Sequence, residues 1–600
     1  MDNQRLAYRR KRRRIRKLQR MIPGAVAILL IALIIFVGIK TGLFESFAYT
    51  TERADLFRYF GAIADDRAVR IVDGEITTDQ VKVIDGFLYI PLARAKEEFN
   101  DRFYYDENDG KLLYTTAVEV ISASLGASSY TKGGAPVTTP YVVFLEDEGE
   151  LLVALDYVRL YSDFTYELFG GAGEPYRFRM DKTGGSNTAA TVTKAQAVRV
   201  DMDKKAEILV DLKEGDQVIV LNEENTDWTK VQTEDLVIGY YESRYLGDTF
   251  PVSGEDPVPY TEPEFTCIHK DGPIRLIWDN VTTEAANSGL KQRLSGQQGI
   301  TTVSPTWFYL INNDGDITSI ATHDYVSTAH ELGMEVWGLV ENMTYNDELK
   351  MKKILSFSDK RAYMISQLIG YAQEYELDGI NVDFEALPSD AGEDFAQFIR
   401  ELSIACRQAQ LVLSVDNYVS TAATSHYHRA AQGECVDYVI IMGYDEHYNG
   451  SEESGSVASI NFVIDGITKT LEEVPADKVI NAVPLYTRVW TETPKTADQA
   501  EKEDPNTKYI PYTLNVETLG MAEALEYVAN SGAEVKWDEE TQQHYAEWQK
   551  SGDRTVKVWL EDEDSLTAKI QSMHNFNLAG VAAWQLHFAN DMAWAALAKF

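Results

Sequence analysis

From about Thr266 to the C-terminus, apolar strand-like runs alternate with helix-like segments, and this alternation restricts the possible folds more than any other feature. Helical stretches such as RAYMISQLIGYAQEYE separate most of the runs. Eight βα units over residues 266–600 predict a parallel (β/α)8 barrel. The seventh connection, about 491–562, is too long for a loop and predicts an α+β insertion. The strand candidates are IRLIWD, TVSPTWFYL, EVWGLVEN, GINVDFE, LVLSVDNYV, YVIIMGYDE, VINAVPLYTRVW and GVAAWQLHF.

The fourth run, GINVDFE, carries polar side chains at every second position. In a strand such residues share one face, so Asn381, Asp383 and Glu385 are expected to point into the barrel. Glu385 then lies at the C-terminal end of its strand, where such barrels place their chemistry. Like charges this close are costly to ionise together, so one carboxyl can stay protonated near neutral pH and act as a general acid. Burying two carboxylates for no purpose is the less favourable alternative.

DGINVDFE resembles the D-G-x-D-x-D-x-E strand of family 18 glycoside hydrolases, in the branch of bacterial spore-cortex and cell-wall N-acetylglucosaminidases. The motifs MGYD, VPLYTRVW and VAAWQL, each near the end of a predicted strand, extend the resemblance over residues 266–600. The resemblance implies cleavage of β-1,4 bonds next to N-acetylglucosamine, in peptidoglycan or a chitin-like glycan. The resemblance thus gives an expectation for both the substrate and the reaction.

The resemblance also implies a role for each residue of the motifs. Glu385 would protonate the glycosidic oxygen, and Asp383 would orient the substrate's own acetamide as it attacks the anomeric carbon, so no protein nucleophile is needed. Tyr444 would bind the acetamide oxygen, although core packing is an alternative for Tyr444 and Trp584. The residues expected to contact substrate are Asn381, Asp445, Trp584, Tyr486, Trp490, Asn342 and Asp416.

Asn381 departs from the chitinase pattern, which has aspartate at this position. An amide can hydrogen-bond Asp383 but cannot carry a charge. Asp383 would then experience less like-charge repulsion, which is expected to alter the pH profile. The cell-wall branch commonly has asparagine here, so the residue does not indicate an inactive site.

No metal and no cofactor are predicted. His426 and His428 form an HxH pair, but neither this pair nor His447 has an evident third ligand. The three cysteines are far apart and give no disulfide framework. No G-x-x-x-x-G-K-[ST] phosphate-binding loop occurs.

The N-terminus predicts a membrane anchor. Residues 1–21 form a basic segment, with ten Lys/Arg in the first twenty residues, and 22–44 form an apolar run whose core carries no charge. The positive-inside rule predicts a cytoplasmic tail, one transmembrane helix, and a catalytic domain outside the cell. A cleaved signal peptide is the alternative. The rest of the chain is strongly acidic, which makes nucleic acid an improbable partner.

Two further modules are predicted before the barrel. Residues 45–185 resemble the N-terminal domain of copper amine oxidases, but no His or Cys precedes Cys267, so a spacer without copper is expected. Residues 186–250 resemble a bacterial SH3-like barrel that either binds cell-wall peptides or acts as a spacer. A Pro-rich linker, 251–265, follows.

Three classes of function fit the sequence. The first is an anchored glycoside hydrolase, the second a lectin-like glycan-binding protein without turnover, and the third an envelope scaffold. Binding-only relatives typically lose the terminal glutamate of the strand motif, and Glu385 is present here. The hydrolase is therefore the favoured interpretation.

Overall fold

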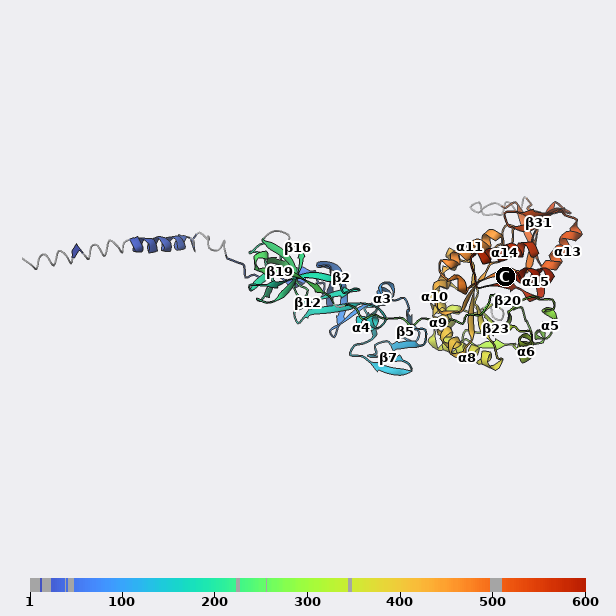
Figure 1. Cartoon of the computed structure of the whole chain (residues 1–600), viewed down its shortest axis with the longest axis horizontal. Coiled ribbons are helices and arrows are strands. Elements are labelled where there is room, and N and C mark those ends of the chain that lie inside the picture. The colour runs from blue at the N-terminus through green and yellow to red at the C-terminus, as the bar shows by residue number, and fades with distance from the viewer. Residues whose placement is uncertain are drawn as a thin grey trace, which may run out of the picture. The chain divides into compact units, whose positions relative to one another are not determined.

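The computed structural model describes residues 11–12, 23–37, 39–40, 48–222, 227–254, 256–343, 348–496 and 510–600 (Figure 1). The chain divides into two compact units. The first contains Met1–Phe99 and Asp147–Tyr260, and the second contains Asn100–Glu146 and Thr261–Phe600. The predicted spacer, 45–185, is thus divided between the units.

The predicted transmembrane segment, 22–44, is described at residues 23–37 and 39–40, which are helical and exposed. Among the described residues, no helix combines the length and the apolar character needed to cross a membrane. Of the basic tail, 1–21, only residues 11–12 lie within the described part of the chain.

The first unit is rich in β-structure and contains a mixed sheet and an antiparallel sheet. The mixed sheet has the order β11-β12-β1-β2-β3-β10, in which β1 is parallel to β12 and antiparallel to β2. Apolar side chains of both sheets, such as Val69 and Val231, share one core. The mixed sheet and its helices are α2 (Leu56–Phe60), β1 (Arg67–Val72), β2 (Glu75–Ile84), β3 (Phe87–Pro91), α3 (Leu92–Glu98), β10 (Glu150–Ala154), α4 (Leu155–Val158), β11 (Thr165–Gly171) and β12 (Glu174–Asp181).

The region predicted as an SH3-like barrel forms a seven-stranded sheet, β15-β14-β18-β17-β16-β13-β19. Its alternating strands are amphipathic, with residues such as Val198 and Tyr241 buried. The assignment to the SH3-like class stays a prediction. The strands are β13 (Ser186–Val192), β14 (Gln196–Arg199), β15 (Ile208–Leu212), β16 (Gln217–Asn222), β17 (Trp228–Gln232), β18 (Ile238–Glu242) and β19 (Leu246–Ser253).

The second unit is built around a closed parallel barrel, which confirms the predicted (β/α)8 fold. The strand order is β20-β21-β23-β24-β25-β26-β27-β33, and β33 pairs with β20 to close the ring. These strands are almost continuously apolar because both faces are covered. They are β20 (Ile274–Asp279), β21 (Thr302–Leu310), β23 (Glu335–Glu341), β24 (Gly379–Asp383), β25 (Val412–Tyr418), β26 (Tyr438–Met442), β27 (Val479–Pro484) and β33 (Gly580–Trp584), with β22 (Ile317–Ser319) antiparallel to β21.

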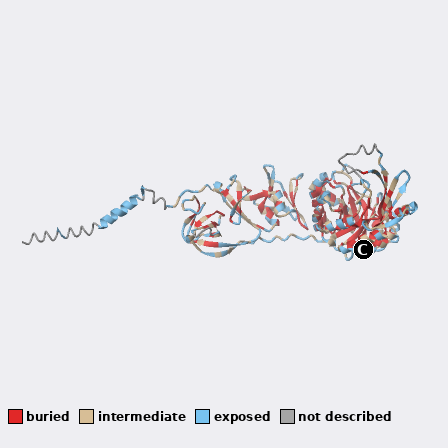
Figure 2. Ribbon diagram, turned by 90° about the horizontal axis from the view of Figure 1, so that it is seen from above, coloured by how far each residue is buried: buried red, intermediate tan, exposed pale blue. Residues whose placement is uncertain are grey.

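Helices surround the strands of this barrel (Figure 1). Buried residues are concentrated in the barrel (Figure 2). Its lumen is filled by large side chains, including Trp337 and Tyr438, whose rings stack at 5.6 Å. The helices are α5 (Leu290–Arg293), α6 (His323–Glu331), α7 (Met351–Leu355), α8 (Ser358–Glu374), α9 (Gly392–Ala409), α10 (Arg429–Cys435), α11 (Ile460–Leu471), α14 (Glu563–Asn575) and α15 (Asp591–Leu597).

A small antiparallel sheet from residues 100–146, the hairpin sheet, packs against the barrel helices α8 and α9. Asp106 accepts a hydrogen bond from the Ser358 amide (2.6 Å) and thereby caps α8, whose own N-cap residue supplies no side-chain bond. The Tyr104 hydroxyl donates to Asp394 at the start of α9 (2.6 Å). The strands are β4 (Phe103–Asp106), β5 (Lys111–Thr115), β6 (Val120–Ser124), β7 (Ser129–Lys132) and β8 (Ala135–Thr138).

The seventh connection forms an α+β insertion that starts at Tyr486, slightly before the predicted bound. β28 continues directly from the loop after β27 and is the second strand of the sheet β29-β28-β32-β31-β30. The elements are β28 (Tyr486–Pro494), β29 (Tyr512–Gly520), α13 (Met521–Ser531), β30 (Val535–Asp538), β31 (Gln543–Lys550) and β32 (Arg554–Leu560).

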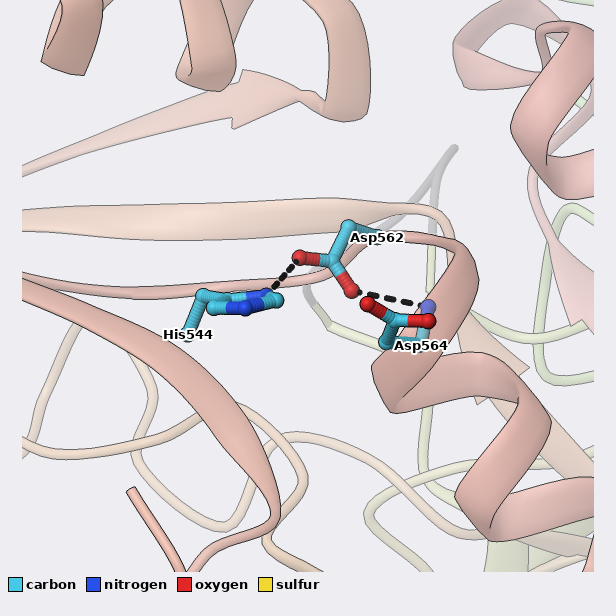
Figure 3. A group of neighbouring side chains, drawn as sticks. All are labelled: His544, Asp562 and Asp564. Atoms are coloured by element: carbon cyan, nitrogen blue, oxygen red, sulfur yellow. Dashed lines mark hydrogen bonds and ion pairs between the residues drawn. The ribbon is translucent and has the colours of Figure 1, made fainter. Parts of the chain in front are cut away.

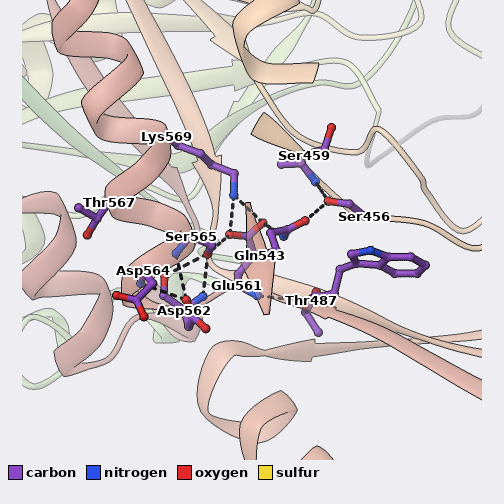
Figure 4. Close-up of polar contacts among 12 residues, drawn as sticks. Ser456, Ser459, Thr487, Gln543, Glu561, Asp562, Asp564, Ser565, Thr567 and Lys569 are labelled. Atoms are coloured by element: carbon purple, nitrogen blue, oxygen red, sulfur yellow. Dashed lines mark hydrogen bonds and ion pairs between the residues drawn. The ribbon is translucent and has the colours of Figure 1, made fainter. Parts of the chain in front are cut away.

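A buried polar network joins the insertion to the barrel (Figure 4). The Lys569 ammonium on α14 bonds both carboxylate oxygens of Glu561 (2.9 and 3.1 Å), and both side chains are almost fully buried. Glu561 also accepts from Gln543 (2.7 Å) and Ser565 (2.8 Å). Because every member has partners, the network fixes the insertion on α14.

Replacing Lys569 by methionine is expected to lower the free energy of unfolding by about 3 kcal/mol, because Glu561 would remain buried without its cation. Thermal unfolding followed by circular dichroism measures the change. Lys599→Met, which removes a half-exposed pair with Glu563, is the matched control and should cost less than about 1 kcal/mol. Equal losses in the two variants would contradict the structural role of the buried pair.

Candidate active site

Asn381 lies at the centre of a hydrogen-bonded layer inside the barrel. Its carbonyl oxygen accepts from the Trp278 indole (2.9 Å) and Ser304 (3.1 Å), and its amide donates to Ser414 (3.0 Å) and Asp416 (2.8 Å). Among the described residues, no hydrogen bond joins this amide to Asp383, contrary to the bond that the sequence suggested. Asn381 therefore orients Asp416 and completes the layer below the Asp383 and Glu385 carboxyls.

Asp383 follows one layer higher and is partly buried. Burial, together with the neighbouring Asp416, Glu385 and Glu341 carboxyls, raises its pKa well above the ordinary range. Its Oδ1 atom has no hydrogen-bond partner among the described residues. A buried acceptor without a donor is costly, so this oxygen is suited to a donor that arrives with a ligand.

Glu385 lies two residues beyond β24 and faces an open cavity. Burial raises the pKa of Glu385, a hydrogen bond from the Tyr418 hydroxyl (2.6 Å) lowers it, and nearby Asp445 and Glu341 raise it further. Asn342 holds the backbone of the glutamate: it accepts from the Glu385 amide and donates to the Glu385 carbonyl, both at 2.9 Å. The result is a positioned carboxyl that keeps its proton above the usual pH range of glutamate.

The turn after Glu385 is held by two tyrosines. Ala386 has φ of +50°, a left-handed conformation that non-glycine residues seldom adopt. The Tyr418 hydroxyl accepts from the Ala386 amide (3.3 Å). The Tyr427 hydroxyl accepts from the Leu387 amide (3.3 Å) and donates to the Phe384 carbonyl (3.1 Å). These bonds stabilise the turn that presents the glutamate.

Tyr418→Phe is expected to lower the catalytic rate at its pH optimum about tenfold, because the Glu385 carboxyl loses the hydrogen bond that positions it. The tyrosine bond lowers the pKa of Glu385, so its removal raises that pKa and shifts the alkaline limb of the pH profile to higher pH. Rates measured across pH test both effects. Tyr363→Phe removes an exposed bond to Asp316 and should leave the profile unchanged. An alkaline limb that stays in place or moves to lower pH contradicts this role of Tyr418.

A second group of residues lies after β26 and at the start of β28. Burial and the nearby Tyr486 and Asp383 raise the pKa of Tyr444, so its hydroxyl stays protonated and available as a donor. Asp445 accepts from the Tyr486 hydroxyl (2.5 Å) and from Arg488 (2.6 Å). The insertion thus fixes the loop that follows β26, because Tyr486 and Arg488 both belong to β28.

The two predicted tryptophans lie in different environments. Trp584 ends β33 and is partly buried, with its ring 6.0 Å from that of Trp278. Trp490 is fully buried, and its indole donates to the Gly455 carbonyl (2.8 Å). The role of Trp490 as a wall of the substrate site stays a prediction, and β28 places its indole against the loop that follows β26.

Glu385 opens into a cavity of about 640 Å³ at the C-terminal ends of β23 and β24. This volume lies within the range of ligand sites, about 300–1,000 Å³. The cavity is bounded by βα loops, as expected for a barrel whose strands end at the active site. Its lining includes Asn342, Met343, Lys352, Lys353, Pro388 and Asp390.

Most predicted site residues are brought together, and four contributors were missed. Tyr418 lies two positions after Asp416 on β25, so the same period-two pattern could have identified it. Glu341 ends β23 as a charged residue in an apolar strand, which is a second detectable signal. Trp278 and Arg488 had no such signal, because their roles depend on contacts between distant strands.

Among the described residues, one group of side chains that could bind a metal ion has its ligand atoms within 4.8 Å of one another. The group consists of His544, Asp562 and Asp564 (Figure 3). Asp562 already accepts from His544 Nδ1 (2.6 Å) and from the amides of Asp564 and Ser565 (both 3.0 Å), so it caps α14. The group is accounted for as a helix cap.

The parallel barrel carries paired carboxyls at the C-terminal end of its fourth strand, an arrangement typical of glycoside hydrolases. Residues 340–589 match the family described as Glycosyl hydrolases family 18. The match covers less than half of the chain.

Known proteins resemble this part of the chain. The cortical fragment-lytic enzyme of Bacillus subtilis (strain 168) is 26% identical over 265 residues, which cover 42% of this chain and 57% of that protein. The class V chitinase CHIT5 of Lotus japonicus is 24% identical over 279 residues, 42% of this chain and 65% of that protein. The chain thus spans less than two thirds of either relative.

Among solved structures, the spore cortex-lytic enzyme SleL of Bacillus megaterium QM B1551 is 18% identical to this chain. The match covers 64% of this chain and 88% of that structure, with a TM-score of 0.45.

Proposed function

We propose that the protein hydrolyses β-1,4 bonds next to N-acetylglucosamine by substrate-assisted catalysis with retention of configuration. The observation that carries the proposal is the pair of carboxyls at the end of β24. Asp383 is partly buried, and its buried Oδ1 atom has no partner among the described residues. Glu385 beside it has a raised pKa and faces a cavity.

In the first step, protonated Glu385 gives its proton to the glycosidic oxygen of the leaving sugar. The carbonyl oxygen of the substrate's 2-acetamido group attacks the anomeric carbon as the bond to the leaving sugar breaks. Asp383 accepts the acetamide N–H, which orients the group and stabilises the charge that develops on it. Tyr444 donates to the acetamide oxygen and holds it on the line of attack.

In the second step, ionised Glu385 takes a proton from a water molecule. That water attacks the anomeric carbon and reopens the cyclic intermediate. Two inversions at one carbon give net retention, and Glu385 ends protonated as it began. The substrate supplies its own nucleophile, so one protein carboxyl serves both steps.

The proposed substrate is a wall polysaccharide that contains N-acetylglucosamine. The similarity to a cortical fragment-lytic enzyme supports peptidoglycan, and the similarity to a class V chitinase supports a chitin-like polymer as the second candidate. The full-length protein would be incubated with purified peptidoglycan and with N-acetylglucosamine oligomers, and new reducing ends counted. Glycan that is bound but never cleaved would contradict hydrolysis and favour a lectin-like or scaffold role.

We also propose that the first unit contributes wall binding through its seven-stranded sheet. A polar cavity of about 480 Å³ is lined by Tyr49, Asp203, Trp228, Glu242 and Arg244. Its mixture of both charges suits a cell-wall peptide, which also carries both. Titration of the full chain with soluble stem peptides tests this, and Trp228→Ala should weaken any binding.

The membrane anchor and the position of the barrel outside the cell are proposals that rest on the basic and apolar N-terminal sequence. Protease added to intact cells would degrade the barrel if it lies outside. Protection of the barrel until the cells are lysed would overturn the proposed location.

A further inference from the structure

We propose that the glycan site continues from Glu385 to the hairpin sheet, where Tyr105 and Asn108 contact sugars remote from the cleaved bond. The substrate would then be a linear polysaccharide that occupies several subsites, rather than a short terminal fragment. This inference deepens the proposed function and rests on it.

Two adjacent cavities carry the proposal. The first, of about 640 Å³, contains Glu385, and the second, of about 570 Å³, contains Tyr105 and Asn108. Lys352 and Lys353 line both cavities, so the two share a wall of side chains. Each cavity alone has the size of a ligand site.

The hairpin sheet is fixed at the catalytic face of the barrel. In a (β/α)8 barrel, the N-termini of the helices lie on the same side as the C-terminal ends of the strands. Asp106 bonds the first amide of α8 (Ser358), and Tyr104 bonds Asp394 in the first turn of α9. The side chain of Asn108 donates to the Ser356 carbonyl (2.9 Å). A subsite held in this way costs little to organise when substrate binds.

The lining of the second cavity suits a sugar. Tyr105 provides an amphipathic ring that is partly exposed, and a pyranose presents both an apolar face and hydroxyl groups. Asn313 and Lys353 add polar groups that can bond to sugar hydroxyls. An aromatic ring combined with a few placed polar groups is the usual composition of a ligand site.

Tyr105→Ala in the full-length protein tests the inference. We expect kcat/KM for a hexasaccharide of N-acetylglucosamine, or for peptidoglycan strands, to fall roughly tenfold through KM. Cleavage of a chromogenic disaccharide should be unchanged, because that substrate ends within the first cavity. Tyr130→Ala is the control: it removes a half-buried aromatic of the same sheet that is not among the lining residues of either cavity.

Equal rates for Tyr105→Ala and the parent on long substrate would overturn the proposal, as would equal losses on long and short substrates. Binding is measured separately in the Glu385→Gln background, by calorimetry with the disaccharide and the hexasaccharide. If the parent proves inactive, hydrolysis fails as the function. The subsite is then tested by binding: Tyr105→Ala should weaken binding of the hexasaccharide and leave binding of the disaccharide unchanged.

Discussion

Glu385→Gln is expected to lower the rate of glycan hydrolysis about a thousandfold, the largest loss for any substitution in the chain. General acid–base catalysis contributes about 10²- to 10⁴-fold, and this residue is proposed to supply it in both steps. Glutamine has nearly the same shape, and its carbonyl oxygen can still accept the Tyr418 bond. The site should therefore bind glycan while failing to cleave it.

Reducing-end release and glycan affinity, measured on the same preparation, separate these effects. The control is Glu374→Gln, which makes the same chemical change at an exposed position on α8. If Glu385→Gln keeps more than a tenth of the parent rate, another group must be the acid. If it loses affinity in proportion to rate, the substitution has disturbed the site instead.

Asp383→Asn is expected to lower kcat about a hundredfold, because the acetamide loses the carboxyl group that orients it and accepts its N–H as charge develops. KM should change less, since the interaction strengthens as charge develops. Single-turnover rates on an N-acetylglucosamine oligomer measure this effect. A loss that appears only in KM would mean that Asp383 binds substrate but does not assist the reaction.

The same substitution is expected to stabilise the fold at neutral pH by about 1 kcal/mol, a usual gain when a strained active-site group is removed. The folded-state pKa of Asp383 is raised, so the folded protein holds a proton that the unfolded chain has released. The free energy of unfolding of the parent therefore falls as pH rises from the ordinary pKa of aspartate through the folded value. Below the ordinary pKa, both states are protonated and this advantage of the variant should disappear, a pattern that thermal unfolding across pH will show.

Much of the barrel could be predicted because each strand can be recognised from the residue pattern of a short stretch of sequence. Each strand is a short, mostly apolar run, and the polar residues of the fourth run, Asn381, Asp383 and Glu385, occur with the period of a strand. Period and position were enough to place the two carboxyls at the catalytic face. The insertion was detectable because no simple connection needs so many residues.

Three features could not be predicted, because they depend on contacts between distant segments. Trp490 lies in a motif next to the site, yet its ring is fully buried and its indole bonds Gly455, 35 residues earlier in the chain. The amide of Asn381 bonds Asp416 from the neighbouring strand rather than Asp383 from its own. The separation of the hairpin sheet from the predicted spacer depends on contacts such as that of Asp106 with Ser358, which lies 252 residues away in the sequence.

The contact between Asp106 and Ser358 has consequences for the folding of the chain and for its truncation. The hairpin sheet is synthesised long before α8 and α9, so it must wait for most of the barrel before its bonds can form, which slows folding. A fragment that starts at residue 261, where the second segment of the barrel unit begins, would lack Asp106, the residue that caps α8. It would also lack Thr115, which accepts a hydrogen bond from the buried Gln397 (2.8 Å). The smallest self-sufficient piece that contains the barrel is therefore discontinuous in sequence, and it includes residues encoded upstream of the segment that matches the family.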